Sequence, residues 1–360
     1  MNTRILLLAA ALGLSAAASA QSNTATTSQT GDDNAATVAQ VGTTNAAAVT
    51  QTGRDHEAHV QVSGRENAVR VRQSGADNGV GRALAEAGVL VTGDANAVDV
   101  AQDGRGNAAA VTVTGDRNAA TVGQGVEVGF GAVGLAFGNR AGIAQAGSDN
   151  GATVVQGSAA GFLAGALGAG NAAEVSQSGS GNGATVAQGS AAGALVLAGG
   201  LANRAAVTQT GDGNAATVTQ GAAVAVLGAQ GAVANAVTLT QADGSRAVVT
   251  QEGLSGTATI GQAGGSSVAV GQGGGAWNVV LLDQTGGSTG VIEQDGSGNA
   301  VVGVGSTRCG PIFGARSADG SALAVTQTGE ANALVLDQTN GSAATVVQNG
   351  TMNTAAVVQD

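Results

Sequence analysis

Four neighbouring side chains near the beginning of the sequence have the right chemistry to bind a metal: Asp55, His56, Glu57 and His59. Imidazole nitrogens and carboxylate oxygens are common ligands of zinc and related ions. In an extended segment, however, successive side chains point to opposite faces. The repeat described below places His56 on the inner face and His59 on the outer face. We therefore expect no metal site here.

Two other patterns resemble binding motifs by spelling only. Residues 129–134 read Gly-Phe-Gly-Ala-Val-Gly, but neither a helix-forming segment nor a suitably spaced acidic residue follows them, as a dinucleotide site requires. The acidic residues Asp32, Asp33, Asp149 and Asp212 lack the glycine-rich calcium repeat around them. We interpret the first as a glycine-rich loop and the second as solvated turns, so no cofactor is expected.

The remaining reactive group, Cys309, is the single cysteine of the chain. No disulfide can form within one chain, and no histidine lies in the surrounding repeats to activate a thiolate. A net charge of −11 with scattered arginines also disfavours nucleic acid as a partner. We therefore predict neither an enzyme nor a nucleic-acid-binding protein.

The dominant feature is an internal repeat of eleven residues, Gln-x-Gly-x-x-Asn-x-Ala-x-Val-x-Gln, which is clearest at 29–40 and 40–51. It returns with substitutions to within one residue of Asp360. With 62 glycines, four phenylalanines, one tryptophan and no tyrosine, a wide globular core is excluded. The chain must instead bury a thin core built from repeated short elements.

Each unit alternates with the period of a β-strand, because Asn34, Ala36, Val38 and Gln40 occupy every second position. Charged residues fall on the intervening positions, which indicates one buried and one solvated face. We predict that the inward amides stack into ladders along the repeat axis. The expected ladder residues are Asn34, Gln40, Asn45, Gln51, Asn67, Gln73, Asn96, Gln102, Asn150, Gln156, Asn182, Gln188, Asn214, Gln220, Asn332, Gln338, Asn353 and Gln359.

These units predict an all-β fold, a β-solenoid with two strands in each coil of about 22 residues. Strands of about seven residues alternate with glycine-containing turns of about four residues. Equivalent strands in successive coils lie about 4.8 Å apart. The whole sequence supplies roughly twelve coils and a rod of about 55–60 Å.

The repeated unit resembles the curlin repeat of curli, the amyloid fibres on the surface of enteric and related bacteria. The resemblance covers most of the chain after residue 20. It implies export, passage through a dedicated outer-membrane pore, assembly with a nucleator or sibling subunit, and a role in biofilm matrix and adhesion. It leaves open whether this chain is a major or a minor, nucleator-like subunit.

Several boundaries follow from the sequence. Residues 1–20 have a basic residue, a short apolar stretch and a small-residue cleavage site, as in a secretory signal peptide. We expect regular repeats in 21–123, repeats with long insertions in 124–241, degenerate repeats in 242–305, an irregular insertion in 306–320 and regular repeats again in 321–360. Later apolar runs are too short to span a membrane.

Four connections are longer than the others, 124–139, 156–171, 188–203 and 220–235. They recur at every second strand, so a two-strand coil places them on one edge as Gly/Ala-rich loops. Two interpretations remain open: extra strands that widen the coil, or an exposed adhesive ridge. The apolar residues concerned are Phe130, Leu135, Phe137, Phe162, Leu163, Leu167, Leu195, Leu197 and Leu227.

The sequence therefore favours a secreted structural subunit that associates with itself into fibres. The alternative is a monomeric β-solenoid that acts as an adhesin or an ice-binding protein. Soluble solenoids usually end in atypical caps that block edge pairing, whereas this repeat continues to Gln359. The outward positions also lack the regular threonine rows that ice binding would favour.

Overall fold

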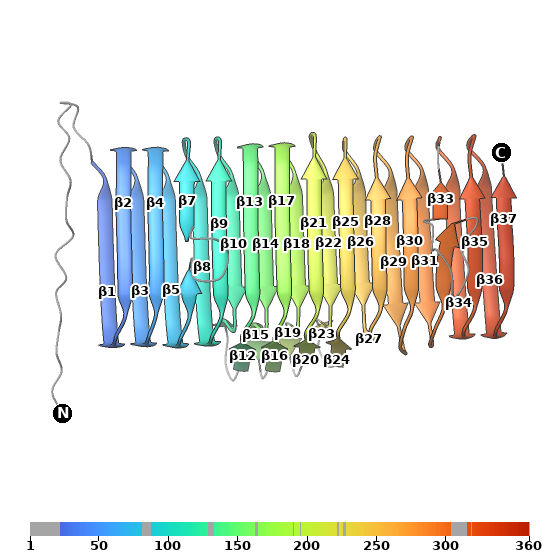
Figure 1. Cartoon of the computed structure of the whole chain (residues 1–360), viewed down its shortest axis with the longest axis horizontal. Helices are drawn as coiled ribbons and strands as arrows, with labels where there is room; N and C mark the ends of the chain where they lie inside the picture. The colour runs from blue at the N-terminus through green and yellow to red at the C-terminus, as the bar shows by residue number, and fades with distance from the viewer. Residues whose placement is uncertain are drawn as a thin grey trace.

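A computed structural model of the chain describes residues 22–80, 88–128, 133–162, 165–189, 191–194, 196–221, 223–225, 228–303, 315–317 and 319–359. These residues form strands and turns, and no helix occurs among them. The strands lie side by side along one axis (Figure 1). Every strand pairing is parallel and joins equivalent strands of successive coils. The prediction of a β-solenoid is confirmed.

One wall of the solenoid, the first sheet, takes one strand from each coil. Its members in axial order are β1 (Thr24–Asp32), β3 (Ala46–Arg54), β5 (Ala68–Ala76), β8 (Ala97–Arg105), β10 (Ala119–Gln124), β14 (Gly151–Gln156), β18 (Gly183–Gln188), β22 (Ala215–Gln220), β26 (Arg246–Gln251), β29 (Ser267–Gly273), β31 (Thr289–Asp295), β34 (Ala322–Glu330) and β36 (Ala343–Thr351). These thirteen strands define thirteen coils in the described part of the chain, one more than expected.

The opposite wall, the second sheet, takes the alternate strands. It comprises β2 (Ala35–Thr43), β4 (Glu57–Arg65), β6 (Gly79–Val80), β7 (Val89–Thr92), β9 (Ala108–Thr114), β13 (Arg140–Ser148), β17 (Ala172–Ser180), β21 (Arg204–Thr210), β25 (Ala236–Ala242), β28 (Thr257–Gln262), β30 (Val279–Gln284), β32 (Ala300–Gly303), β33 (Ala315–Ser317), β35 (Ala333–Gln338) and β37 (Thr354–Gln359). Strands β6 and β7 both pair with β4 and so belong to the same coil, and strands β32 and β33 both pair with β30 and likewise belong to one coil.

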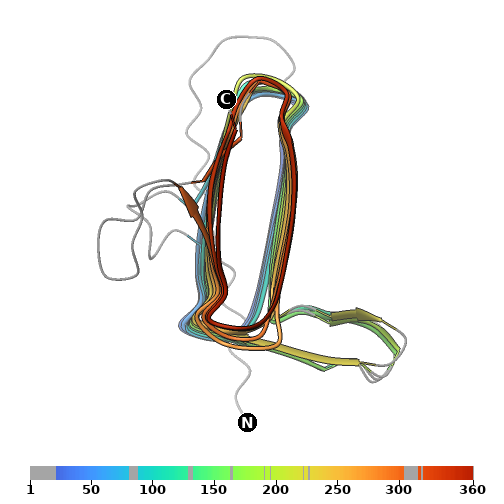
Figure 2. The same ribbon diagram turned by 90° about the vertical axis from the view of Figure 1, so that its right-hand side faces the viewer.

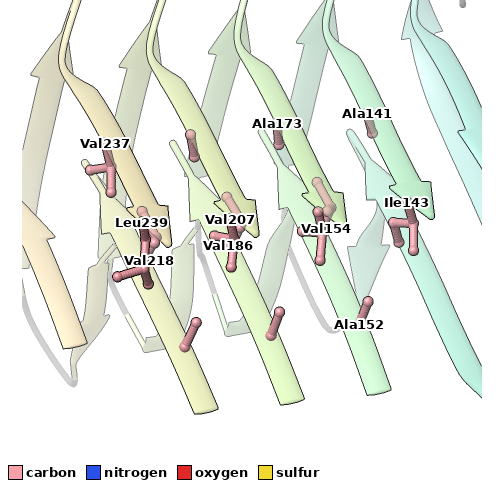
Figure 3. Close-up of a cluster of buried hydrophobic side chains, with 14 of the residues drawn as sticks. Ala141, Ile143, Ala152, Val154, Ala173, Val186, Val207, Val218, Val237 and Leu239 are labelled. Atoms are coloured by element: carbon pink, nitrogen blue, oxygen red, sulfur yellow. The ribbon is translucent and has the colours of Figure 1, made fainter. Parts of the chain in front are cut away.

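The core lies between the two sheets and consists of small aliphatic side chains. Along a typical strand, positions two, four and six point inward, as at Ala47, Val49 and Gln51 in β3, and all three are at most 3 % exposed. Figure 3 shows alanine and valine side chains from both sheets filling the narrow interior. Burying each valine contributes about 1.5–3 kcal/mol. Because the two sheets lie only about 10 Å apart, larger side chains cannot fill the interior of every coil.

The turns explain why glycine recurs in the repeat. At Gly53, φ is +129°, and an added Cβ would lie 2.0 Å from the Gly75 carbonyl oxygen in the next coil. A side chain is therefore excluded by the neighbouring coil as well as by the backbone conformation. Two residues later, Asp55 has φ of +56°, a left-handed conformation that aspartate tolerates. This pair of conformations reverses the chain before the next strand.

The four long connections form short strands, which agrees with one of the two interpretations that the sequence left open. They contain β11 (Glu127–Val128), β12 (Val133–Phe137), β15 (Ala159–Phe162), β16 (Gly165–Ala169), β19 (Ala191–Ala194), β20 (Val196–Leu201), β23 (Ala223–Ala225) and β24 (Gly228–Val233). We call this unit the fin. It projects from one edge of the solenoid (Figure 2), as the even spacing of the connections predicts.

Strands of the fin stack in the same axial direction as the solenoid. The outgoing strands β11, β15, β19 and β23 form a separate sheet, and the returning strands β12, β16, β20, β24 and β27 (Gly253–Leu254) extend the first sheet. The base of the fin is narrow, since a Cβ on Gly168 would lie 2.7 Å from the Gly157 nitrogen. The same approach occurs between Gly200 and Gly189. Glycine thus allows the two layers to touch.

Several sequence predictions fall on residues outside the described ranges. These are the signal peptide at 1–20, most of the irregular insertion at 306–320 with Cys309, and part of the dinucleotide-like stretch at 129–134. Phe130, Leu163, Leu195 and Leu227 of the expected ridge also lie outside the described residues. Phe137 and Leu167 are described and are 44 % and 38 % exposed.

Candidate functional site: the amide ladders

A continuous row of glutamine side chains runs inside the first sheet through every described coil. In each neighbouring pair, the Nε2 of one glutamine donates to the Oε1 of the next, over 2.7–3.0 Å. The members are Gln29, Gln51, Gln73, Gln102, Gln124, Gln156, Gln188, Gln220, Gln251, Gln272, Gln294, Gln327 and Gln348. We call this row the first ladder.

The second Nε2 hydrogen of these glutamines ties the two sheets together. Gln51 donates to the Ala35 carbonyl oxygen at 2.9 Å, and Gln156 donates to that of Arg140 at 3.1 Å. These carbonyls belong to the first residues of the facing second-sheet strands. Reversing one carboxamide would turn its oxygen towards that carbonyl oxygen and lose the bond. The facing carbonyls therefore keep all the amides pointing in one direction.

The matching column in the second sheet is interrupted. Gln145, Gln177, Gln209, Gln241, Gln262 and Gln284 form one run, and Gln338 and Gln359 form another. Val62, Val91 and Val113 occupy this column between Gln40 and Gln145. Ser317 occupies it between Gln284 and Gln338. We call this the second column.

Each interruption leaves buried polar atoms without a partner. Among the described residues, the Nε2 of Gln40 and of Gln284, the Oε1 of Gln145 and of Gln338, and the Oγ of Ser317 have no hydrogen bond. Each glutamine atom belongs to a residue that borders a valine or Ser317 in the column. A buried unpaired amide costs about 1–3 kcal/mol. The second column is therefore the weaker of the two.

Asparagines form two further columns where strands begin. In the column before the first sheet, the backbone N–H of Asn67 donates to Asn45 Oδ1 at 3.1 Å, and Asn67 Nδ2 reaches the Gly93 carbonyl oxygen at 2.7 Å. Each asparagine thus links its own coil to both neighbours. From Ser245 onward, serines replace asparagine in this column, and Ser245 Oγ donates to the Ala242 carbonyl oxygen at 2.7 Å.

The structure places the eighteen expected ladder residues in these four columns. Six belong to the first ladder: Gln51, Gln73, Gln102, Gln156, Gln188 and Gln220. Three belong to the second column: Gln40, Gln338 and Gln359. The asparagines divide into Asn45, Asn67, Asn96, Asn150, Asn182 and Asn214 on one side and Asn34, Asn332 and Asn353 on the other. Gln40 is not brought against another glutamine, because Val62 is its neighbour.

Many members of the columns were missing from the sequence-based set. They include Gln29, Gln124, Gln145, Gln177, Gln209, Gln241, Gln251, Gln262, Gln272, Gln284, Gln294, Gln327 and Gln348. The sequence does contain a signal that would have found most of them: a glutamine stands six positions after an asparagine or serine, even where the residues between them diverge from the repeat. Asn118 to Gln124 and Ser266 to Gln272 show that spacing.

The two histidines occupy different environments. His56 is 1 % exposed and stands in an asparagine column, where its backbone N–H donates to Asn34 Oδ1 at 3.2 Å. Its Nε2 lies 3.1 Å from the Thr52 carbonyl oxygen, whereas its Nδ1 has no hydrogen bond. His59 is on the outer face, 3.0 Å from the Glu57 carboxylate. Within the described ranges, no three His, Cys, Asp or Glu residues form a cluster that could hold a metal ion.

The outer turns carry ion pairs between adjacent coils. Arg117 Nε lies 2.7 Å from Asp149 Oδ1, and Arg65 Nη2 lies 2.8 Å from Asp94 Oδ2. The side-chain hydrogen bond from Arg117 holds the pKa of Asp149 below its ordinary value. Asp94 likewise has a lowered pKa, because it accepts bonds from the Arg65 side chain and then from the Arg65 backbone N–H. All four groups are exposed to solvent, so each pair adds little stability.

Both end coils present unpaired strand edges within the described chain. The outer edges of β1 and β2 at one end, and of β36 and β37 at the other, have no neighbouring strand there. The inward aliphatic side chains of the end coils are correspondingly only partly buried, as Val38 and Val346 show. Unpaired edges of this length are templates for further strand pairing.

A family model described as "Curlin associated repeat" matches the sequence three times, at residues 20–53, 31–64 and 93–125. These matches fall on the regular coils before the fin, where glutamine, glycine, asparagine, alanine and valine occupy their repeat positions. A search of curated proteins found no match. In the described part of the chain, no helix is long and apolar enough to cross a membrane.

Proposed function

We propose, from the finding that this chain is a curlin-repeat protein, that it is a secreted structural subunit which polymerises into curli-like extracellular fibres. Such fibres would serve the biofilm matrix and surface adhesion. The fold supports a structural role, since its polar interior is used in hydrogen bonds between coils and its core consists of small aliphatic side chains. Residues 1–20 would direct export as a signal peptide, and an outer-membrane pore and a nucleator or sibling subunit would be its partners.

The observation that carries this proposal is the complementarity of the two end coils. At one end, Gln29 and Gln40 occupy the two glutamine columns. At the other end, Gln348 and Gln359 occupy the same columns. Glutamine thus returns at both ends of the second column, although valines and Ser317 interrupt that column in the interior.

A head-to-tail joint between two copies would continue both columns. The Nε2 of Gln348 would donate to Oε1 of Gln29 of the next copy, in the direction followed by the first ladder. Gln359 would donate in the same way to Gln40 of the next copy, whose column neighbour in its own chain is Val62. Strand β36 would pair with β1, and β37 with β2. Each added copy would extend the rod by about 60 Å, or thirteen spacings of about 4.8 Å.

The direct test is to incubate the chain from residue 21 at neutral pH and examine it by electron microscopy, thioflavin fluorescence and fibre diffraction. We expect unbranched fibrils with a reflection near 4.7–4.8 Å along the fibre axis. A chain that remains monomeric in sedimentation after days at high concentration contradicts the proposal.

A pair of variants at the C-terminal end coil tests the joint itself. Gln348→Lys places a charge in the ladder that the next copy must bury, so we expect elongation to slow strongly. Val347→Lys is the matched control, because Val347 points outward and is 71 % exposed. Circular dichroism of both monomers shows whether the solenoid is intact. Equal elongation rates for the two variants would argue against this joint.

A further inference from the structure

The fin carries an exposed apolar column on the outer side of its returning strands. Phe137, Ala169, Leu201, Val233 and Leu254 are the last residues of β12, β16, β20, β24 and β27, and parallel pairing places each beside the next. Ala276 continues the column through an isolated bridge to Leu254. The four larger side chains are exposed, from 36 % at Val233 to 53 % at Leu254. Adjacent members lie about 4.8 Å apart.

Charged residues end this column at equal distances from its centre. Arg105 pairs with Phe137 at one end. At the other end Ser297 follows Ala276, and Glu330 follows Ser297, as the bonds Gly298 N–H to Ala276 O and Ala331 N–H to Ser297 O show. Counted along the column, Arg105 and Glu330 are each four steps from Val233.

The four long connections, which carry Phe137, Ala169, Leu201 and Val233 of the column, contain almost no charge. Residues 125–138, 157–170, 189–202 and 221–234 include one charged side chain, Glu127, in a chain with 37 charged residues and a net charge of −11. Two copies of such an acidic chain repel each other over most of their surface. At the fin, they can approach without that repulsion.

We infer that the apolar column pairs with the same column of a second copy, lying antiparallel, and thereby joins fibres side by side. This inference rests on the proposed polymerisation. A two-fold axis parallel to the strands and midway between the Val233 residues of the two copies gives a self-complementary interface. It places Arg105 opposite Glu330 of the second copy and Leu201 opposite Leu254. Val233 then faces Val233.

This arrangement also pairs a large residue with a small one. Trp277 follows Ala276 and is 69 % exposed. The same two-fold axis places it over Gly170 of the second copy, where an added Cβ would meet nothing within 4 Å. Only a surface with the same axial spacing can match the column along its whole length, and a second copy provides that spacing.

The size of the column indicates that pairing depends on polymerisation. Five spacings of about 4.8 Å and a strand length of about 16 Å give roughly 400 Å² per copy. Stable interfaces bury about 800 Å² per partner, so two monomers should associate weakly. In a fibre the same contact recurs in every subunit, and the contacts reinforce one another.

The test compares Val233→Lys with Val248→Lys, which changes an exposed valine on the outer face of the first sheet. Filaments are scored by thioflavin fluorescence, and lateral bundling by electron microscopy. We expect both variants to form filaments, with bundling lost only in Val233→Lys, where two lysines would face each other. Bundling that persists in Val233→Lys would overturn the inference.

Charge exchange tests the antiparallel orientation. Arg105→Glu removes the exposed ion pair with Asp77 of the same chain and also places two glutamates opposite each other, so it should reduce bundling. Adding Glu330→Arg restores only the contact between copies, and it should restore bundling. A double variant no better than Arg105→Glu alone would rule out this register. Wild-type filaments could instead stay single and adhere to lipid vesicles, with the adhesion lost in Val233→Lys. That result would show that the column binds an apolar surface and not a second copy.

Cross-linking separates this inference from the proposed polymerisation. In a Cys309→Ser background, Val233→Cys should form disulfide-linked dimers with diamide several-fold faster than Val248→Cys. The measurement applies to filaments and to concentrated monomer alike. Absence of filaments would count against the proposed function, whereas equal cross-linking at the two positions would count against lateral pairing.

Discussion

Gln284 and Gln338 lie one level on either side of Ser317, which is too short to bond to either. The Nε2 of Gln284, the Oγ of Ser317 and the Oε1 of Gln338 are all buried without partners. This gap separates the last glutamine pair of the second column from the longer run before it. A glutamine at position 317 would therefore join the two runs of the second column.

Ser317→Gln should stabilise the solenoid by filling this gap. Two new amide bonds at about 0.5–1.5 kcal/mol each give roughly 1–3 kcal/mol, to be measured by urea denaturation of the monomer. Ser288→Gln is the control, because Ser288 Oγ already donates to the Thr285 carbonyl oxygen at 2.6 Å, and we expect it to destabilise. A lower midpoint for Ser317→Gln would show that the level of β33 cannot take a glutamine.

Two glycines should respond in opposite ways to alanine. At Gly147, φ is +114° and an added Cβ would lie 2.0 Å from the Gly179 carbonyl oxygen. Gly147→Ala should therefore cost more than about 3 kcal/mol, since the overlap adds to a backbone strain of about 1–3 kcal/mol. Gly183→Ala, with nothing within 4 Å of the new methyl, should stabilise by about 0.4–1 kcal/mol. Similar denaturation midpoints for both variants would contradict this account of the turns.

The ion pairs of the turns predict a small loss of stability in acid. Because folding lowers the pKa of Asp149, the contribution of this group is present above its unfolded pKa and disappears as the pH falls through the lower folded value. Arg117→Ala should thus be slightly less stable than wild type at neutral pH and equal to it in strong acid. High salt should also reduce the difference. A difference that persists in strong acid would assign another role to Arg117.

Trimming the fin should leave the solenoid intact. Replacing each long connection with a four-residue turn restores the spacing of regular coils, and surface insertions are usually tolerated. We expect unchanged β-sheet circular dichroism and continued fibril growth, with loss of bundling. Collapse of the β-sheet signal would show that the fin is an integral wall of the coil.

Residue alternation was sufficient to predict the walls, since Ala47, Val49 and Gln51 in β3 all point inward as their two-residue spacing requires. Residue alternation could not show that Gln40 lies beside Val62 in the next coil, because that depends on which repeat units share a sheet. The insertion at 81–87 further obscures that assignment by lengthening one coil to 29 residues between Gln73 and Gln102.

The sequence left extra strands in the fin as one of two interpretations, because no comparable alternation of residues decided between them. Gly165 to Ala169 in β16 contains two glycines and two alanines, which have low strand preference. Pairing with β12 and β20 decides their conformation, and such long-range pairing is absent from a local pattern. The expectation of one shared edge was correct because it depended only on the parity of the strands.

The common orientation of the first ladder also gives the rod an electrical axis. Each amide group has a dipole of about 3.5 D, and thirteen of them from Gln29 to Gln348 have components of the same sign along the rod. A head-to-tail filament would accumulate this polarisation with length, so its two tips would differ in their attraction for ions and for incoming subunits. Neighbouring filaments that run in opposite directions would cancel it.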